Sequence, residues 1–301
     1  MVSSIPAVRL TPRAVKTRGI RVPLTFTLGT SAVVVRTVPL LLVDLETDES
    51  VDRPDLSLLL TTSGARAVAG HLSEAIDLVK GVPTTPLDVA KLLQRRFALL
   101  GVTGTVRMAL SAFDMALWDA IARALGQPLS VLLGASPRPL PAYDSRGLGL
   151  MEPGHVADEA EKMLAKGLKA LKLRLGYSTL AEDLAALDAV RSRVGPEIEI
   201  MVDYNQALAP VEALKRGYVL DHRDVSWIEE PIGHDDYQSL AQLATELQTP
   251  IQIGENFNGP EAMLRALKAG ASDLMMPDVA RIGRWRHWMD AGRRPRHGGR
   301  D

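Results

Sequence analysis

The fold of this chain is decided by the stretch Ile198-Glu199-Ile200-Met201-Val202-Asp203-Tyr204-Asn205, an apolar run that ends in an acidic residue. Three later stretches repeat this arrangement: Trp227-Ile228-Glu229-Glu230-Pro231, Ile253-Gly254-Glu255-Asn256 and Met276-Pro277-Asp278. The acids of successive stretches lie 26, 26 and 23 residues apart, about the length of one strand–helix unit. The spacing therefore predicts parallel strands whose terminal carboxylates gather at one edge of the sheet.

Around these stretches, from about residue 139, short apolar runs alternate with helical patterns, which is typical of βαβ units. We expect strands at Leu140–Ser145, Ala170–Leu175, Ile198–Tyr204, Val225–Glu229, Ile251–Gly254 and Leu274–Met276. We expect helices at Pro153–Lys166, Thr179–Arg193, Pro210–Asp221, Tyr237–Leu247 and Pro260–Ala269. Six regular units with acids at the strand ends favour a (β/α)8, TIM-like barrel over a doubly wound sheet.

The N-terminal half predicts a separate unit. Alternation in Ala14–Ile20 indicates an exposed strand, and Arg36–Leu45 reads as a strand core. Residues 63–134 are helical in pattern, and Gly126-Gln127-Pro128 stops the longest run. Strands followed by helices are typical of an α+β domain. The predicted fold class is therefore α/β, with an α+β capping domain over 1–138 and a barrel over 139–283.

The regular pattern stops after the sixth unit. Residues 281–301 contain seven arginines, and we interpret 284–301 as an aberrant Arg/Gly-rich tail from a truncated or frameshifted reading frame. The alternative is a basic tail that binds an anionic partner. A barrel incomplete after about six units would leave two open parallel edges.

The composition suits a soluble globular protein of one large domain or two domains. The chain has 301 residues, 46% hydrophobic and 24% charged, with a net charge of -1. This near-neutral charge argues against a nucleic-acid partner, and no apolar run approaches the roughly 20 residues that cross a membrane. The sequence contains no cysteine, which excludes disulfides and thiolate metal sites. We expect a cytoplasmic location.

The strand-end acids suggest a metal site. Clustered carboxylates of Asp203, Glu229 and Glu255 would repel one another without a cation, and hard oxygen ligands suit Mg²⁺ better than zinc. The alternative is that they are helix caps and surface ion pairs. Period-two alternation points Lys172 and Arg174 into the same barrel, where crowding is expected to lower the pKa of Lys172 and make it a usable base. Alternatively, both cations only neutralise the carboxylates.

The sequence closely resembles the mandelate racemase/muconate lactonizing enzyme family of the enolase superfamily. The resemblance is carried by Leu171–Gln206, Trp227–Pro231, Gly254–Asn256 and Met276–Asp278, and extends through Phe113–Ala120 and Ala142-Tyr143-Asp144-Ser145. The resemblance implies a homo-oligomer with a small-molecule carboxylate substrate. It implies Mg²⁺ bound by Asp203, Glu229 and Glu255, and a substrate carboxylate held by Lys172, Ser145 and Asn205. It also puts Arg174 at the position of the first catalytic base, and Asp278 at that of the acid that orients a catalytic histidine.

The chain departs from this family at both bases. Arg174 stands where the family has lysine, and a guanidinium with a pKa above about 12 is a poor base. The family's histidine lies on a later strand, and we assign its role to neither His287 nor His297. Ser50–Ser57 carries charges and a proline where the family has a strand and loop that close over the substrate. Val22–Val35 resembles the apolar cap loop of the family or is simply a hairpin.

The function expected from the resemblance is Mg²⁺-dependent racemisation of a 2-hydroxy carboxylate. This reaction removes the α-proton and passes through a metal-stabilised enolate. We expect it to be impaired in this chain, because racemisation needs one base on each face of the carbon. Two alternatives stay open: dehydration of an acid sugar through the same enolate, and a non-catalytic remnant that binds Mg²⁺ or carboxylates.

Overall fold

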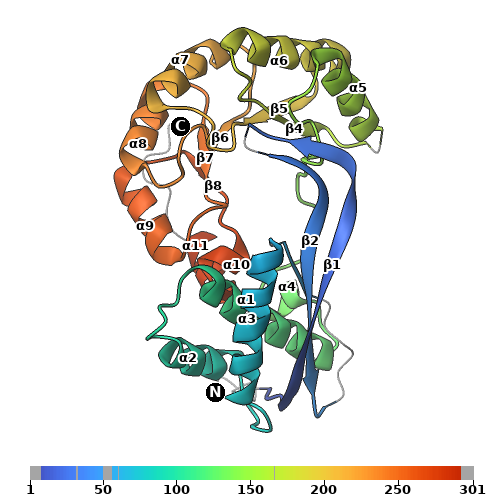
Figure 1. Cartoon of the computed structure of the whole chain (residues 1–301), viewed down its shortest axis with the longest axis vertical. Coiled ribbons are helices and arrows are strands. Elements are labelled where there is room, and N and C mark those ends of the chain that lie inside the picture. The colour runs from blue at the N-terminus through green and yellow to red at the C-terminus, as the bar shows by residue number, and fades with distance from the viewer. Residues whose placement is uncertain (1–7, 32, 50–55, 60, 166, 293–301) are drawn as a thin grey trace.

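The computed structural model describes residues 8–31, 33–49, 56–59, 61–165 and 167–292. Within these ranges no helix is both long enough and apolar enough to cross a membrane. Two hydrophobic cores organise the chain, one in the N-terminal part and one between the helices and strands of the C-terminal part. The ribbon in Figure 1 shows these parts joined along one side by a long pair of strands.

The N-terminal part is an antiparallel sheet covered by helices, as the sequence predicts. Its strands are β1 (Pro12–Gly29), β2 (Val34–Thr47) and β3 (Leu56–Leu59), in the order β1-β2-β3. Its helices are α1 (Thr62–Asp77), α2 (Pro86–Arg96), α3 (Gly104–Ala124) and α4 (Leu129–Leu132). Alternate residues of β2, Leu41, Val43 and Leu45, are buried in the same core as α1 and α3, because successive strand side chains point to opposite faces.

The C-terminal part is a parallel sheet in the order β4-β5-β6-β7-β8 with helices on its outer side (Figure 1). Its strands are β4 (Ala170–Arg174), β5 (Glu199–Asp203), β6 (Ile228–Glu229), β7 (Ile251–Ile253) and β8 (Leu274–Met275). The helices are α5 (Pro153–Leu164), α6 (Leu180–Val194), α7 (Pro210–Leu220), α8 (Tyr237–Glu246), α9 (Pro260–Ala269), α10 (Val279–Ile282) and α11 (Arg284–Gly292). The predicted strand–helix alternation is confirmed from residue 153 to 275.

Period-two alternation sorts the side chains of these strands. Leu171, Leu173 and Val202 lie in the core that also contains the inner faces of the helices. The intervening residues Lys172 and Asp203 are equally buried but lie outside that apolar core. Polar groups are therefore kept on the inner side of the sheet, away from the helices.

The expected strand at Leu140–Ser145 is wrong as a regular strand. Only one isolated parallel bridge, between Asp144 and Leu171, forms there. The amide of Asp144 donates to the carbonyl of Ala170 at 2.9 Å, and the amide of Lys172 donates to the carbonyl of Asp144 at 2.9 Å. Pro139 and Pro141 supply no N–H to a ladder, so pairing cannot extend toward the N-terminus. The described sheet thus has five strands rather than six.

The C-terminal end also differs from an unstructured tail. Arg284–Gly292 forms α11, and Trp285 packs against the core of the N-terminal part. His297 and the Arg/Gly-rich residues after 292 lie outside the described residues, as does most of the Ser50–Ser57 stretch. The domain limits 1–138, 139–283 and 284–301 remain predictions.

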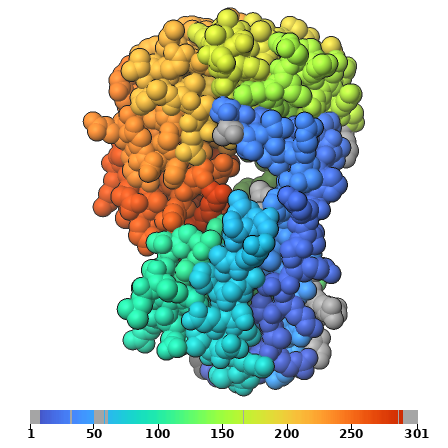
Figure 2. Space-filling model, in the orientation of Figure 1, coloured from blue at the N-terminus to red at the C-terminus, as the bar shows by residue number. Residues whose placement is uncertain are grey.

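The hairpin formed by β1 and β2 crosses from the capping part to the start of the barrel (Figures 1 and 2). At its tip the amide of Leu150 donates to the carbonyl of Gly29 at 3.0 Å. The Phe26 ring centroid lies 5.6 Å from the guanidinium carbon of Arg146. The Val22–Val35 stretch is therefore a hairpin whose tip rests on the loop that follows Asp144.

Gly149 permits this contact, and its replacement by alanine is expected to displace the hairpin tip. A Cβ atom at residue 149 would lie 2.2 Å from the amide nitrogen of Gly29, so one backbone must move. We expect a loss of roughly 1–3 kcal/mol in unfolding free energy, measured by urea denaturation, and faster proteolysis within the hairpin. Gly154→Ala is the matched control, because a Cβ atom there meets nothing within 4 Å. Equal stability of both variants would contradict the docking role of Gly149.

Asp114 on α3 gives the capping part a specific pH dependence. Burial raises the pKa of Asp114 to about 7, although the amide of Trp285 and the charge of Arg284 lower it. A raised carboxyl pKa means that stability is present below the unfolded-state pKa and is lost as pH rises through the folded pKa. Asp114→Asn should therefore gain stability relative to the native chain from about pH 4 to pH 7, on the order of 3 kcal/mol in total. Urea denaturation across this range tests it, and parallel curves for the two proteins would contradict it.

Candidate active site

The candidate site is a row of charged side chains at the carboxyl ends of β4, β5 and β6. Arg174 pairs in register with Asp203, and Asp203 pairs in register with Glu229. Residues in register on neighbouring parallel strands point to the same face of a sheet. All three are at least nine-tenths buried, and all lie on the inner side of the barrel strands.

Lys172 lies one layer below this row and joins its two carboxylates. Its Nζ lies 2.7 Å from Oε1 of Glu229 and 3.0 Å from Oδ2 of Asp203. Burial alone would lower the pKa of Lys172, but the charges of Asp203 and Glu229 together raise it above its ordinary value. The expectation of a lowered lysine pKa is therefore wrong in this arrangement. Crowding by the arginine is outweighed by two carboxylates in direct contact.

Glu229 is the most deeply buried carboxylate of the row. Burial raises its pKa to about 7, with a further increase from Asp203 and opposing effects from Lys172. Its Oε2 atom is buried with no hydrogen-bond partner, and so is Oδ1 of Asn205. The amide of Asn205 donates to Oδ1 of Asp203 at 2.8 Å, which keeps the asparagine beside the acid. Two buried acceptors without a donor mark a place where a cation or a donor group can bind.

Arg174 is a fixed cation. Its Nη1 donates to the carbonyl oxygens of Ser145 at 2.7 Å, Gly147 at 2.8 Å and Lys172 at 3.4 Å. The contact of Ser145 with the row is thus through its main chain, and its side chain is exposed. A guanidinium bound in this way is a fixed donor that orients the loop of Ser145 and Gly147.

Glu255 and Asp278 lie further from this centre. Glu255 follows β7, is half-buried, and contributes to the raised pKa of Glu229. In the described part of the chain, however, no three acidic or histidine side chains are close enough together to hold a metal ion. Asp278 caps α10, where its carboxylate accepts the amide of Arg281 at 2.8 Å. The roles inferred from the resemblance for these two residues remain predictions.

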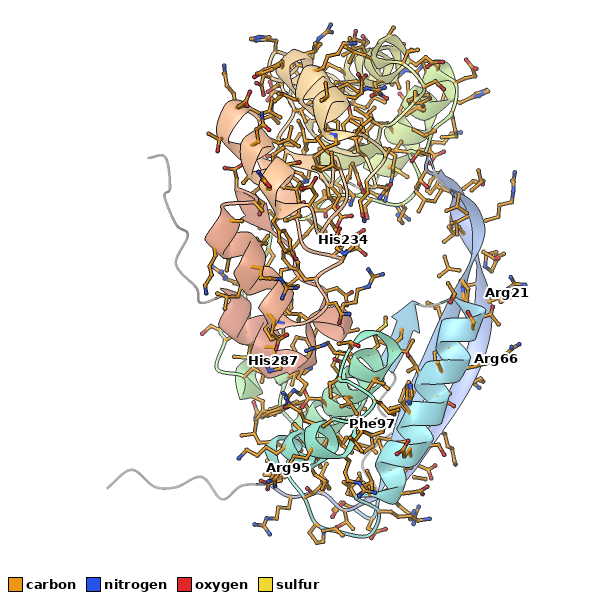
Figure 3. The ribbon with its side chains drawn as sticks, turned by 60° about the vertical axis from the view of Figure 1, so that its left-hand side comes forward. Arg21, Arg66, Arg95, Phe97, His234 and His287 are labelled. Atoms are coloured by element: carbon orange, nitrogen blue, oxygen red, sulfur yellow. The ribbon has the colours of Figure 1, made fainter. Side chains whose placement is uncertain are left out.

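Sequence reasoning missed a polar network behind the row. Glu230 is 1% exposed and accepts hydrogen bonds from the side-chain amides of Gln206 at 2.9 Å and Asn256 at 2.8 Å. Burial raises its pKa to about 7. Gln206 also accepts the amide of His234 at 3.1 Å, so three loops of the barrel mouth are connected. Figure 3 shows His234 at the inner side of the arc of barrel elements. The one signal in the sequence was the second acid of Glu229-Glu230-Pro231.

The backbone is strained at the same place. Asn205, Gln206 and Glu230 adopt positive φ angles of 46°, 65° and 37°; the first two lie two and three residues after Asp203, and Glu230 directly follows Glu229. Such conformations cost on the order of 1–3 kcal/mol each for non-glycine residues and cluster at functional sites.

Tyr143 is a second residue that sequence reasoning left without a role. Its ring meets that of Trp227 edge to face, with centroids 5.5 Å apart. Burial raises the pKa of Tyr143; Lys172 lowers it, and Glu229 and Asp203 raise it further. The phenol is therefore close enough to the row for its charges to act on it, and with a raised pKa it is protonated at neutral pH.

Comparison with known proteins places the chain among enolase-like proteins. Residues 13–134 match the mandelate racemase/muconate lactonizing enzyme N-terminal domain, and 155–293 match the enolase C-terminal domain-like family. An enolase from alpha proteobacterium BAL199, solved with bound Mg, is 38% identical with a TM-score of 0.90, covering 94% of this chain and 79% of that chain. An enolase from Bradyrhizobium, in complex with magnesium and mandelic acid, is 34% identical with a TM-score of 0.86, covering 94% and 78%.

A curated relative is the L-talarate/galactarate dehydratase of Salmonella typhimurium, which is 33% identical over 225 residues, 73% of this chain and 56% of that protein. The D-galactarolactone cycloisomerase of Agrobacterium fabrum is 32% identical over 187 residues, 61% of this chain and 49% of that protein. The chain thus spans about half the length of these curated relatives. From both domain matches, the shared fold and the row of strand-end acids, this chain belongs to the mandelate racemase/muconate lactonizing enzyme family of the enolase superfamily.

Proposed function

We propose that this chain carries a site for Mg²⁺-assisted removal of the proton next to a carboxylate, and that its substrate is an acid sugar that is dehydrated. The observation that carries the proposal is the buried row of Arg174, Asp203 and Glu229 with Lys172 between the two carboxylates. Buried charges are costly unless they are paired or bind a charged ligand. A site that gathers two carboxylates and two cations suits a divalent metal together with an anionic substrate.

The residues present fit Mg²⁺ in their donor chemistry. Asp203, Glu229 and Glu255 would supply oxygen ligands, which this ion prefers. The unpartnered Oε2 of Glu229 offers one such oxygen in the buried layer. When bound, Mg²⁺ would polarise the substrate carboxylate and stabilise the negative charge that develops as the α-proton leaves. Relatives solved with magnesium support the assignment.

The chain's own cations have separate tasks in this proposal. Lys172, with its raised pKa, is protonated at neutral pH and would pair with the substrate carboxylate, as would Asn205 through its amide. Arg174 would add positive charge to the same place while holding the loop of Ser145 and Gly147. Tyr143 has a raised pKa and is close enough to the row for its charges to act on it, so it would donate a proton to the departing hydroxyl.

The inability of the Arg174 guanidinium to accept a proton favours dehydration over racemisation. Racemisation needs a proton acceptor on each face of the carbon, and a guanidinium bound to three carbonyls is not one. Elimination of a β-hydroxyl needs one base and one acid: the α-proton would pass to Nε2 of His234, whose Nδ1 lies 3.1 Å from Oε1 of Gln206, and Tyr143 would be the acid. The similarity to a galactarate dehydratase supports this reading.

Racemisation of a 2-hydroxy acid is the second candidate, and a specific observation favours it. The hairpin tip that rests beside the site is apolar, with Phe26 packed against the barrel core. The Bradyrhizobium relative is in complex with mandelic acid, whose aromatic ring suits such a cover. Homo-oligomer formation stays a prediction for either substrate.

Proton exchange in D₂O with Mg²⁺ tests these readings. Galactarate, L-talarate and both enantiomers of mandelate would be followed by NMR, with detection of a 2-keto product from the sugar acids. A keto product supports dehydration, and exchange or inversion of mandelate supports racemisation. If the folded chain binds Mg²⁺ but exchanges no α-proton, the site is a binding remnant and the proposal of catalysis is wrong.

A further inference from the structure

A second polar site lies in the seam between the capping part and the last helices. A cavity of about 150 Å³ opens between α2 and α3 on one side and α9 and α11 on the other. Its polar lining comprises Gln94, Arg107, Ser111, Asp114, Glu261, Arg284 and His287. Figure 3 shows His287 on α11, next to the green helices of the capping part. Apolar cavities of this size stay dry, whereas polar ones hold water or a small polar ligand.

Arg107 is built into the wall of this cavity. Its side chain is 12% exposed, and its nearest acidic partner is Glu261, at 3.5 Å and largely exposed. Two glycines with positive φ make room for it: a Cβ atom at Gly259 would lie 2.6 Å from its Cζ, and one at Gly283 would lie 3.2 Å from its Cγ. Its Nε is nevertheless buried without a hydrogen-bond partner. Nε–H can only donate, so the arginine lacks an acceptor here.

The ring of His287 also carries an N–H group, at Nδ1, that has no acceptor. Its Nε2 lies 3.1 Å from Nη2 of Arg284, and because a guanidinium only donates, Nε2 must accept. Burial and then Arg284 lower the pKa of His287, which keeps the ring neutral and places its proton on Nδ1. Nδ1 is buried without a hydrogen-bond partner, and the nearby backbone of Ile282 raises the pKa of the ring by less than burial lowers it.

Two donors of the cavity wall therefore lack an acceptor. Two guanidiniums line the cavity, Arg107 and Arg284, together with two acids: Glu261 pairs with Arg107 at 3.5 Å, and Oδ2 of Asp114, whose pKa burial raises to about 7, accepts the amide of Trp285 at 3.2 Å. We propose that this cavity binds a small oxyanion, of the carboxylate or phosphate class, held by Nε–H of Arg107 and Nδ1–H of His287. Charge-assisted hydrogen bonds of this kind are the strong ones in proteins.

This site is separate from the candidate active site. None of its lining residues belongs to the row of Arg174, Asp203 and Glu229 or contacts Lys172. An anion bound here would join α3 of the capping part to α11, and its binding is measurable without any turnover.

The test is calorimetric titration of the full chain with inorganic phosphate and, separately, with acetate, at constant ionic strength. We expect saturable 1:1 binding of at least one of them, weakened about tenfold in Arg107→Gln and in His287→Phe. Arg95→Gln removes an exposed arginine from α2 and should bind as the native chain does. Arg107→Lys keeps the charge but loses the directed Nε–H, so it is used in place of Arg107→Gln if Arg107→Gln does not fold.

Binding of phosphate alone or of acetate alone identifies the preferred class of anion. No saturable binding, or equal binding by the Arg107, His287 and Arg95 variants, overturns the proposal.

Discussion

Replacing Glu229 with glutamine is expected to abolish Mg²⁺-dependent α-proton exchange, with a loss on the order of 10³-fold or more. The carboxylate of Glu229 is fully buried, and its Oε1 binds Lys172 at 2.7 Å. Glutamine has nearly the same volume and keeps an oxygen for Lys172, but it lacks the negative charge that a divalent cation needs. Mg²⁺ affinity, measured by calorimetry, should therefore fall together with exchange.

Glu199→Gln is the matched control for this variant. Glu199 is the exposed first residue of β5, at the opposite end of the strand from Asp203. Its replacement removes the same charge from the same sheet and should leave both exchange and Mg²⁺ binding unchanged. Retention of Mg²⁺-dependent exchange in Glu229→Gln would show that the metal binds elsewhere. It would therefore contradict the function proposed for this site.

Replacing Lys172 with methionine is expected to destabilise the chain by about 3–5 kcal/mol in the absence of Mg²⁺, because removing one partner leaves buried charge uncompensated. The ammonium contacts both Asp203 and Glu229, and the three side chains are at most 6% exposed. Methionine fills the space but leaves two carboxylates facing each other. Mg²⁺ should recover part of the loss, since a divalent cation can take over the neutralising role.

Urea denaturation at pH 8, with and without Mg²⁺, measures both effects. Lys215→Met is the control: this lysine is 67% exposed and 3.8 Å from Glu212, so its loss should change stability by no more than about 0.5 kcal/mol. An equal loss for Lys172→Met with and without Mg²⁺ would mean that the ion does not bind between Asp203 and Glu229.

The order of strands and helices could be predicted because it depends on local periodicity. The alternation of Leu171, Lys172, Leu173 and Arg174 fixes which side chains face the helices and which face inward, whatever the neighbours are. The prediction failed at Leu140–Ser145, where apolar residues suggest a strand but two prolines remove ladder donors. In this segment the lack of backbone donors outweighs the hydrophobicity of the side chains.

The hydrogen-bond and ion-pair partners of each charged side chain could not be predicted from the sequence. Lys172 and Arg174 occupy equivalent positions two residues apart, yet one binds carboxylates and the other binds backbone carbonyls. Which of these occurs depends on where the Asp144 segment runs beside β4. Likewise, Glu230 follows Glu229 in the sequence, but only the loops that carry Gln206 and Asn256 make it a buried acceptor.

The sequence by itself determined the α+β part, the parallel strand–helix units and the acids at their carboxyl ends, because strand and helix periods and strand-end positions are local properties. Only the tertiary structure decided the pairing of Lys172 with Asp203 and Glu229, the direction of the lysine pKa, and the cavity around Arg107 and His287. Those features arise between residues distant in sequence, where burial and neighbouring charge set the free energy of every polar group.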